Sequence, residues 1–547
     1  MNIVAAVFAD FVTGPAGNAS ALLATVGGRG ILARTLLRVA RIEGVSARCL
    51  FVRARDGDAA AAVVRDAGVE DRIEVLPLDS SPRPRRALLT AARKWNLESW
   101  RGGLVGSSWF DEFIDPQAAA LVLDHYRCDA VLCIEGHSPV LDVRIATAMV
   151  AHTQATEHEA KMVFTQAPPG LAGAVMRREA LQDLLEFNIP VGLLLAYRPE
   201  LAQGDPITQP ACYGVPRQVV QTAARFTGDT RRSRELLDMA LAELGEDADA
   251  AALCEWTQGV GHDRAGALPV EVELELTTAD PLPETTLRPR GARVPRREIA
   301  DLAAVQRLAA ELARYDDRLV FLGGHGDPLL HPQFAEVCRI LRSAGVYGIG
   351  VGTALAELTE EHVAALFDNT VDVVEVRIDA HSPETYRRVH GADLYAQVVA
   401  NVERLEALRR ERKAPEPLVV CSLTRCAATM DELERFYDHW IQKVGSAVIT
   451  GYNDYGGLLP ADTLLRATPD LREPCRRLAT RMMLLADGTV ALCGQDCGGE
   501  VRMGNWVTEG VGAAWGGARL VAVREAHRGL NLESLPICER CAEWSRT

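Results

Sequence analysis

Two long segments of this chain alternate short apolar runs with amphipathic stretches, and this alternation limits the possible folds more than any other feature. In residues 1–205, Ile3–Phe8 and Asp129–Ile134 have the length and composition of buried strands, and Leu32–Ile42 has the apolar spacing of a helix. The same rhythm returns in residues 268–455. Strands that alternate with helices predict parallel sheets covered by helices. We therefore expect an α/β protein with a Rossmann-like N-terminal domain and a second α/β domain.

The stretch between these segments has a different pattern. Residues 206–267 contain two helical patterns, Arg231–Leu244 and Ala250–Trp256, and end in the glycine-rich join 259–266. The expected organisation is an α/β domain over 1–205, a helical linker over 206–267, a second α/β domain over 268–455 and a C-terminal domain over 470–547.

The second α/β domain is expected to form a partial parallel barrel. Its first strand is predicted at Val270–Leu276 and its next at Arg318–Leu322, with a helix over Arg297–Arg314 between them. In such barrels the chemistry lies at the carboxyl ends of the strands. The glycine-rich turn 323–332 follows the second strand, so it is a candidate binding loop.

Four cysteines in the C-terminal domain have the pattern of a metal centre. They are Cys475, Cys493 and the C-x-x-C pair Cys538 and Cys541, and Cys497 is a spare or substitute. An Asp-Gly turn at 487–488 predicts a hairpin that brings Cys493 back towards Cys475. Four thiolates satisfy a [4Fe–4S] cluster, but zinc accepts the same four sulfurs. Buried thiols without a metal are a third possibility.

Composition excludes several functional classes. The 547 residues carry a net charge of −15, which argues against a nucleic-acid partner. Thirteen cysteines with a clustered set suggest metal chemistry in a reducing compartment. The N-terminus reads as a strand rather than a signal peptide, and no apolar run is long enough for a membrane span. We therefore expect a cytoplasmic protein without a membrane partner.

The second half of the chain resembles the radical S-adenosylmethionine (SAM) enzymes that carry a C-terminal SPASM or twitch domain. The resemblance rests on the turn 323–332, on the stretch 374–391 and on the C-terminal cysteines with Gly488. It implies that Gly323, Gly324, Gly326 and Asp327 approach the SAM amine. It also implies that Asp379 meets the ribose, and that Cys475, Cys493, Cys538 and Cys541 hold an auxiliary [4Fe–4S] cluster.

One departure from the family pattern bears on the chemistry. The family holds its SAM-binding cluster on C-x-x-x-C-x-x-C after the first barrel strand, yet no cysteine lies between Cys254 and Cys338. The aligned positions are Asp280, Glu284 and Leu287. Carboxylates replace thiolates poorly at such a cluster, so standard radical chemistry and SAM binding are both doubtful. Magnesium at Asp280 and Glu284 is the alternative role.

The N-terminal domain, combined with this second half, resembles the proteins called spiro-SPASM. By itself it is similar to the nucleotidyltransferase and glycosyltransferase families over 21–34, 134–141 and 164–181. The stretch 9–17 lacks the basic pattern of their phosphate loop, and Glu135 or His137 stands where they place a metal-binding Asp.

Three functions follow as hypotheses. The first is a radical SAM-like protein with an auxiliary cluster that modifies or binds a peptide or small molecule, with a redox partner as a further candidate. The second is a nucleotide or sugar-nucleotide transferase acting through the N-terminal domain. The third is a peptide-binding or maturation partner. Further candidates are His325 and His331, as pocket or packing residues, the buried thiols of Cys421 and Cys426, and a pocket-facing Arg425.

Overall fold

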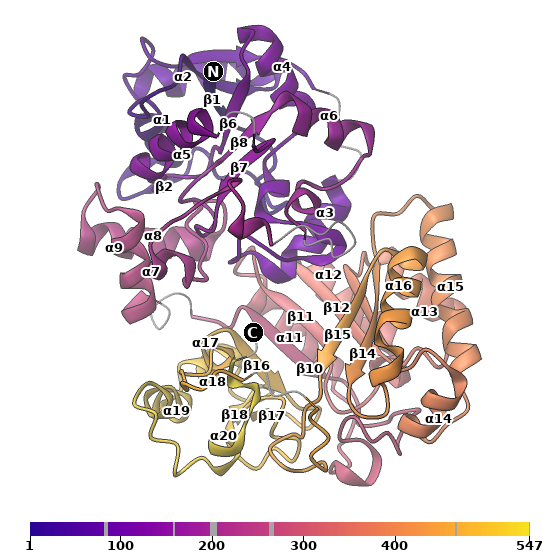
Figure 1. The fold of residues 1–547 in the computed structure, drawn as a ribbon. Helices are drawn as coiled ribbons and strands as arrows, with labels where there is room; N and C mark the ends of the chain where they lie inside the picture. The colour runs from indigo at the N-terminus through magenta and orange to yellow at the C-terminus, as the bar shows by residue number, and fades with distance from the viewer. Residues whose placement is uncertain (81–85, 157–158, 197–204, 262–266, 465–467, 546–547) are drawn as a thin grey trace. The chain divides into compact units, whose positions relative to one another are not determined.

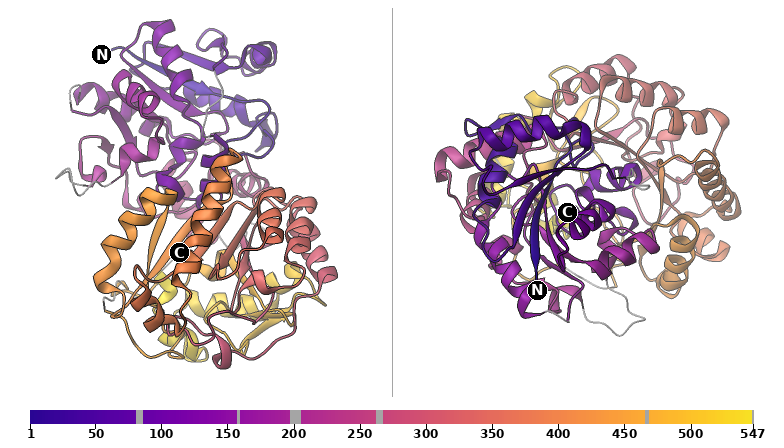
Figure 2. Two further views of the ribbon diagram at one scale, coloured as in Figure 1. Left: turned by 90° about the vertical axis from the view of Figure 1, so that its right-hand side faces the viewer. Right: turned by 90° about the horizontal axis from the view of Figure 1, so that it is seen from above.

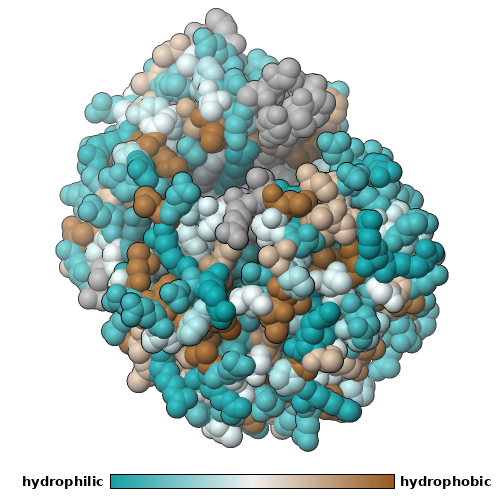
Figure 3. Space-filling model, turned by 60° about the horizontal axis from the view of Figure 1, so that its bottom comes forward, coloured by the Kyte–Doolittle hydropathy of each residue, from teal (hydrophilic) through white to brown (hydrophobic). Residues whose placement is uncertain are grey.

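The computed structural model describes residues 1–80, 86–156, 159–196, 205–261, 267–464 and 468–545. The chain divides into two compact units, Met1–Gly266 and Ala267–Thr547 (Figure 1). Among the described helices, none is long and apolar enough to cross a membrane. On the face drawn in Figure 3, hydrophilic residues dominate and hydrophobic ones form small separate groups.

The first unit is built on a mixed seven-stranded sheet. Its strand order is β5-β4-β1-β6-β8-β7-β9, in which β5, β4, β1 and β6 are parallel and β8 is antiparallel to both neighbours. The strands are β1 Ile3–Phe8, β4 Ala47–Val52, β5 Glu74–Pro77, β6 Ala130–Glu135, β7 Met162–Thr165, β8 Ala174–Arg177 and β9 Cys212–Tyr213, with a small separate pair β2 Thr25–Val26 and β3 Arg29–Gly30. This arrangement agrees with the expected strand–helix alternation.

Helices cover both faces of that sheet. Alternate residues of β1 belong to two separate cores, with Ile3 and Val7 in one and Val4 and Phe8 in the other. The helices are α1 Ile31–Val39, α2 Gly57–Asp66, α3 Arg86–Arg93, α4 Pro116–Tyr126, α5 Val143–Ala155, α6 Arg178–Glu186, α7 Arg217–Val220, α8 Arg231–Leu244 and α9 Ala250–Trp256. The predicted helices α8 and α9 are confirmed, and they pack on the same core as α1. Most of the predicted join 259–266 lies outside the described residues.

The second unit contains a nine-stranded sheet ordered β15-β14-β13-β12-β11-β10-β16-β17-β18. Six successive parallel strands form the partial barrel: β10 Glu271–Glu275, β11 Leu319–Gly323, β12 Gly348–Thr353, β13 Val373–Arg377, β14 Leu418–Arg425 and β15 Ala447–Gly451. Helices connect them, and Figure 2 shows these helices beside the strands: α11 Leu302–Leu312, α12 Phe334–Ala344, α13 Glu360–Asp368, α14 Pro383–His390, α15 Tyr395–Glu411 and α16 Leu433–Val444.

One predicted helix is shorter than the sequence pattern suggested. The helix expected from Arg297 begins at Leu302, because the Asp301 carboxylate accepts a hydrogen bond from the amide of Ala304 and caps the first turn. Residues 297–301 therefore belong to the long loop after β10. The side chain of Arg297 is thereby free to reach the strand ends.

The C-terminal part continues the barrel sheet. Strand β16 Arg481–Leu484 pairs in parallel with β10, and the predicted Asp-Gly turn joins it to β17 Thr489–Ala491, with φ of +91° at Gly488. Strand β18 Arg502–Asn505 and helices α17 Arg477–Thr480, α18 Val511–Trp515, α19 Ala518–Arg528 and α20 Pro536–Arg540 complete it. The hairpin prediction is confirmed, and the barrel and the cysteine domain share one core.

Candidate functional site

The predicted glycine-rich binding turn follows Gly323, the last residue of β11, and packs closely on the first strand. Gly324 has φ of +79°, and its amide donates to Oε1 of Glu273 at 3.0 Å. A side chain at Gly326 would place its Cβ 2.2 Å from a carbonyl oxygen of the loop after β10. These two positions therefore need glycine for contacts within the protein itself.

Asp327 is almost fully buried at the end of the same turn. Its carboxylate accepts hydrogen bonds from the hydroxyl of Thr353 at 2.8 Å and from the amides of Ala354 and Leu329 at 2.9 and 3.0 Å. Burial raises its pKa above the ordinary value. In this arrangement Asp327 fastens the loops after β11 and β12, and contact with the SAM amine stays a prediction.

Asp379 also anchors a loop. It follows β13 with φ of +56°, and its carboxylate accepts from Arg288 Nη2 at 2.6 Å and from the amide of Thr424 at 2.7 Å. Burial alone would raise its pKa, but the charges of Arg288 and His390 lower it below the ordinary value. The predicted ribose contact is likewise untested by this geometry.

The loop after β10 places its three family-aligned positions in different environments. The side chain of Asp280 is 8% exposed and pairs with Nε of Arg290 at 2.6 Å, whereas Glu284 is exposed to solvent. Leu287 packs into a small apolar cluster that includes Cys426. Asp280 is thus engaged by a cation of its own loop, which leaves little support for the magnesium alternative.

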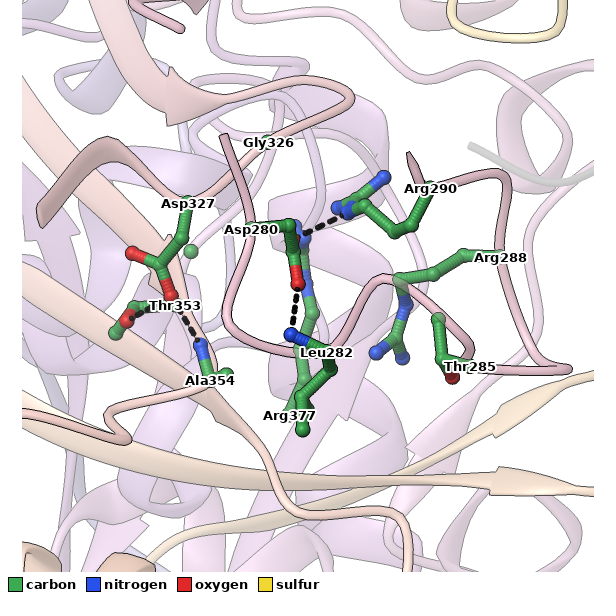
Figure 4. Close-up of a pocket in the computed structure, with 11 residues that line it drawn as sticks. Asp280, Leu282, Thr285, Arg288, Arg290, Gly326, Asp327, Thr353, Ala354 and Arg377 are labelled. Atoms are coloured by element: carbon green, nitrogen blue, oxygen red, sulfur yellow. Dashed lines mark hydrogen bonds and ion pairs between the residues drawn. The ribbon is translucent and has the colours of Figure 1, made fainter. Parts of the chain in front are cut away.

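A cavity of about 250 Å³ lies where this loop meets the ends of β11, β12 and β13. Figure 4 shows the lining side chains and the hydrogen bonds that hold Asp280 and Asp327. The lining residues are Asp280, Leu282, Thr285, Arg288, Arg290, Gly326, Asp327, Gly352, Thr353, Ala354 and Arg377. Three arginines therefore surround the barrel cavity at the strand ends.

The two histidines of the glycine turn differ. His331 Nδ1 accepts from the amide of Gln333 at 3.1 Å and its Nε2 lies 3.2 Å from a backbone carbonyl, so it packs and caps. His325 is 3% exposed, and its Nε2 has no hydrogen-bond partner among the described residues. Its pKa lies well below the ordinary value because burial, and then the charges of nearby arginines, oppose protonation. Cys421 and Cys426 are buried thiols.

The four predicted ligand cysteines lie near one another in the C-terminal part. Burial raises the pKa of the Cys493 thiol, and the charges of Cys538, Cys541 and Cys475 raise it further. Burial also raises the pKa of Cys538 to about 12, with Cys541 and Cys475 as the next contributions. Electrostatic contributions of this kind arise between neighbouring groups, so the four thiols share one part of the C-terminal domain.

Cys497 lies in a different environment. Burial raises the pKa of its thiol to about 12, and its charged neighbours are Arg290, Asp496 and Arg297 rather than the other cysteines. Within the described ranges, no three His, Cys, Asp or Glu side chains stand close enough to hold a single metal ion. The four gathered thiols are therefore near one another without converging on one point.

The side chains of Arg472 and His527 form hydrogen bonds with the backbone of the cysteine segment. Arg472 donates to the carbonyl oxygen of Cys538 at 2.6 Å and to that of Cys541 at 3.5 Å. The ring of His527 is buried, and its Nδ1 accepts from the amide of Cys475 at 3.4 Å. Burial, followed by the charge of Arg472, lowers the pKa of His527 to about 4.

The first unit has its own cavity, of about 570 Å³, near the carboxyl ends of β1, β4 and β6. Asp10, Arg53 and Arg86 lie at its lining, and Asp10 pairs with both arginines at 3.2 and 3.6 Å. Glu135 and His137 also line it, but His137 Nδ1 lies 2.8 Å from Glu135 Oε1. The two predicted cation-binding residues therefore pair with each other.

Family models match two stretches of the second unit. The Radical SAM superfamily model matches residues 285–420, and the SPASM model, described as an iron-sulfur cluster-binding domain, matches residues 475–542. An uncharacterized protein of Treponema pallidum (strain Nichols) is 27% identical over 292 residues, which are 51% of this chain and 79% of that protein. The second unit thus contains a radical SAM domain followed by a SPASM domain, kinds that imply SAM and iron–sulfur clusters.

Solved structures give weaker likenesses. The structure of BtrN in complex with AdoMet and 2-DOIA is 13% identical, covers 50% of this chain and 93% of its own, and has a TM-score of 0.36. Streptococcus suis SuiB bound to precursor peptide SuiA is 9% identical, covers 63% and 80%, and has a TM-score of 0.40. A cytidylyltransferase from Leptospira borgpetersenii is 12% identical, covers 49% and 98%, and has a TM-score of 0.33.

The sequence analysis missed the arginines of the barrel cavity. Arg288 and Arg290 stand beside Leu287 in the loop that lacks cysteines, and Arg377 ends β13. The Arg-Pro-Arg run was the available signal, because a proline-rich loop with two cations is unusual beside a predicted cofactor site. Arg377 could not be placed without knowing which side of β13 faces the cavity.

Proposed function

We propose that the SPASM domain binds one auxiliary [4Fe–4S] cluster through Cys475, Cys493, Cys538 and Cys541. We also propose that the barrel beside it does not carry out standard reductive cleavage of SAM. In this function the protein modifies or binds a peptide or small molecule, with the cluster serving electron transfer, structure or substrate docking. The gathering of the four thiols is the observation that carries the proposal.

The environment of these thiols supports a polynuclear centre. The thiols of Cys493, Cys538 and Cys541 have raised pKa values, so they ionise only when a cation compensates their charge, and an iron–sulfur core supplies that charge. A cluster of four irons takes one thiolate at each iron, so its ligands need not converge on one point. That requirement agrees with thiols that are mutually close but do not form a single-ion site.

The chemistry of the loop after β10 supports the second half of the proposal. It supplies one salt-bridged carboxylate, one exposed carboxylate and one buried leucine at the positions where the family has thiolates. None of these groups is a suitable ligand for iron–sulfur clusters. The glycine turn and Asp379 remain, so binding of SAM or a nucleoside without cleavage is compatible with the site.

Metal analysis of the full-length chain, prepared without oxygen, tests the first half. We expect about four iron and four sulfide per chain, with the charge-transfer absorption of a [4Fe–4S] centre. Cys493→Ser should abolish that absorption because it removes one ligand. Cys497→Ser is the matched control and should retain it. Stoichiometric zinc in place of iron would contradict the proposal.

Incubation with SAM and a strong reductant tests the second half. We expect no 5′-deoxyadenosine above the level of a protein-free control, since no thiolate-held iron is available in the barrel. Formation of 5′-deoxyadenosine that persists in Cys493→Ser would show a second cluster in the barrel. It would refute the proposed loss of SAM cleavage while leaving the proposed auxiliary cluster intact.

A second candidate function has one specific observation in its favour. The cavity of the first unit lies where α/β sheets bind ligands, outside the carboxyl ends of parallel strands on either side of β1. Arg53 and Arg86 there could meet nucleotide phosphates. Calorimetric titration with CTP and Mg²⁺ tests this, with Arg86→Gln expected to weaken binding and the exposed Arg41→Gln expected to leave it unchanged. Absence of binding in the unaltered chain would count against this candidate.

A further inference from the structure

We propose that the barrel cavity is an oxyanion-binding site, in which Arg288, Arg290 and Arg377 hold the phosphate or carboxylate of a small molecule. The site lies in the loop and strand ends where the barrel lacks thiols. It does not depend on the C-terminal cluster, so either proposal can fail without the other.

The three guanidinium groups come from two separate parts of the fold. Arg288 and Arg290 belong to the loop after β10, and Arg377 is the last residue of β13. All three line the one cavity and are mostly buried, with side-chain exposures of 12%, 3% and 16%. Guanidinium groups suit planar or tetrahedral oxyanions because their N–H donors are held in a fork.

The protein's own carboxylates use only part of this donor capacity. Arg290 directs Nε to Asp280 and Nη1 to the carbonyl oxygen of Pro289, and Arg288 directs Nη2 to Asp379. Arg377 makes one long hydrogen bond, 3.4 Å from Nε to Glu375.

Each of the three cations already has a carboxylate partner. Arg290 pairs with Asp280 at 2.6 Å, Arg288 with Asp379 at 2.6 Å and Arg377 with Glu375 at 3.4 Å. An oxyanion would therefore bind through the N–H groups that these pairs leave unused, and not through a surplus of positive charge.

His325 provides an independent observation. Its ring is buried, its Nε2 has no partner within the part of the chain that the structure describes, and the charges of Arg290, Arg297 and Arg377 act on it. A buried polar atom without a partner costs free energy unless a ligand or water satisfies it. An oxyanion held by Arg290 and Arg377 would offset the charges that oppose protonation of this ring.

The barrel cavity adjoins a second one. Asp327 and Thr353 line both, and the second is also lined by Leu329, Leu330 and Leu394. The arginines would hold the charged end group of the ligand, and the apolar side chains of the second cavity would face the rest of the molecule.

Calorimetric titration of the full-length chain with inorganic phosphate, at constant ionic strength in a zwitterionic buffer, tests the site. We expect saturable binding that Arg377→Gln weakens about tenfold or more, which corresponds to about 1.4 kcal/mol. Arg377→Lys keeps the charge but loses the fork, so it should give an intermediate affinity. Acetate as a second probe distinguishes a carboxylate occupant, which would bind more tightly than phosphate, from a phosphate one.

Two control variants separate this site from other cations. Arg339→Gln removes an exposed arginine of α12, and Arg41→Gln removes an exposed arginine of the first unit that lines neither cavity. Both should bind phosphate as the unaltered chain does. Absence of saturation with both probes overturns the proposal, as does binding that neither Arg377 variant weakens. Thermal melting of each variant shows whether it is folded. If Arg377→Gln does not fold, the phosphate affinity of Arg377→Lys decides the result.

Discussion

The ion pair between Arg297 and Glu275 offers a sharp test of how the SPASM domain is held on the barrel. Glu275 is fully buried at the end of β10, and Arg297 meets both of its oxygens at 2.6 and 2.8 Å. The same carboxylate accepts from the amide of Ala486 in the β16–β17 turn at 3.2 Å. Arg297 also donates to the carbonyl oxygen of Cys497 at 3.2 Å. The pair therefore connects the barrel to two points of the cysteine domain.

Replacing Arg297 with methionine leaves a buried carboxylate without its cation. Charge centres about 4 Å apart interact by about 4 kcal/mol at an effective dielectric constant of about 20. Breaking a buried pair from one side costs about 3–5 kcal/mol, which agrees with that figure. The double variant Glu275→Gln with Arg297→Met removes both charges, so it should be less destabilised than Arg297→Met alone.

Hydrogen exchange of the full-length chain, read by mass spectrometry over residues 481–491, measures the effect where it is expected. Protection of these amides should fall about 100-fold or more in Arg297→Met, since about 1.4 kcal/mol corresponds to each factor of ten. The double variant Glu275→Gln with Arg297→Met should recover part of the lost protection. Arg339→Met, which removes an exposed pair on α12, is the control. If the amides of residues 481–491 exchange equally fast in Arg297→Met and Arg339→Met, the buried pair does not hold the cysteine domain on the barrel, and the reasoning fails.

Three further predictions follow from particular contacts. Gly326→Ala should lower the melting temperature, because its Cβ would lie 2.2 Å from a backbone oxygen that cannot move alone; the cost of such overpacking is about 1–3 kcal/mol, read by calorimetry. Arg472→Gln should accelerate iron loss to a chelator, because its hydrogen bonds to the 538–541 backbone are removed. Asp229→Asn should flatten the acid side of the stability profile of the first unit. Burial alone would raise the pKa of Asp229, but the charge of Arg225 lowers it below the ordinary value. The contribution of Asp229 to the free energy of unfolding is therefore present above about pH 4 and is lost as pH falls.

Each of these has a control and a contrary outcome. Gly214→Ala adds a methyl group with no atom within 4 Å and should leave melting unchanged, and equal melting of both alanine variants would contradict the steric account. Arg540→Gln lies in the same segment and should not alter chelation rates. For Asp229→Asn, a profile parallel to that of the unaltered chain down to acid pH would show that Asp229 does not govern acid stability.

The sequence was sufficient for the features that depend on local patterns. Strand β1 was predicted with the bounds it has because a strand covered on both faces is a short continuous apolar run. Helices α8 and α9 were predicted with theirs because burial of one helix face imposes a period of about 3.6 residues. The β16–β17 hairpin followed from one Asp-Gly pair that permits positive φ. The radical SAM and SPASM domains were recognisable because their motifs resemble those of known families, and both family models match there.

The site depended on contacts between residues far apart in the chain, and only the tertiary structure decided these. It assigned Asp327 and Asp379 to loop anchoring, turned Cys497 towards arginines and brought Arg377 to Arg288 and Arg290. A sequence shows which groups are available for chemistry. Which of them are satisfied by a neighbour is set by long-range packing, because a hydrogen bond or ion pair depends on separation in space, not on position along the chain.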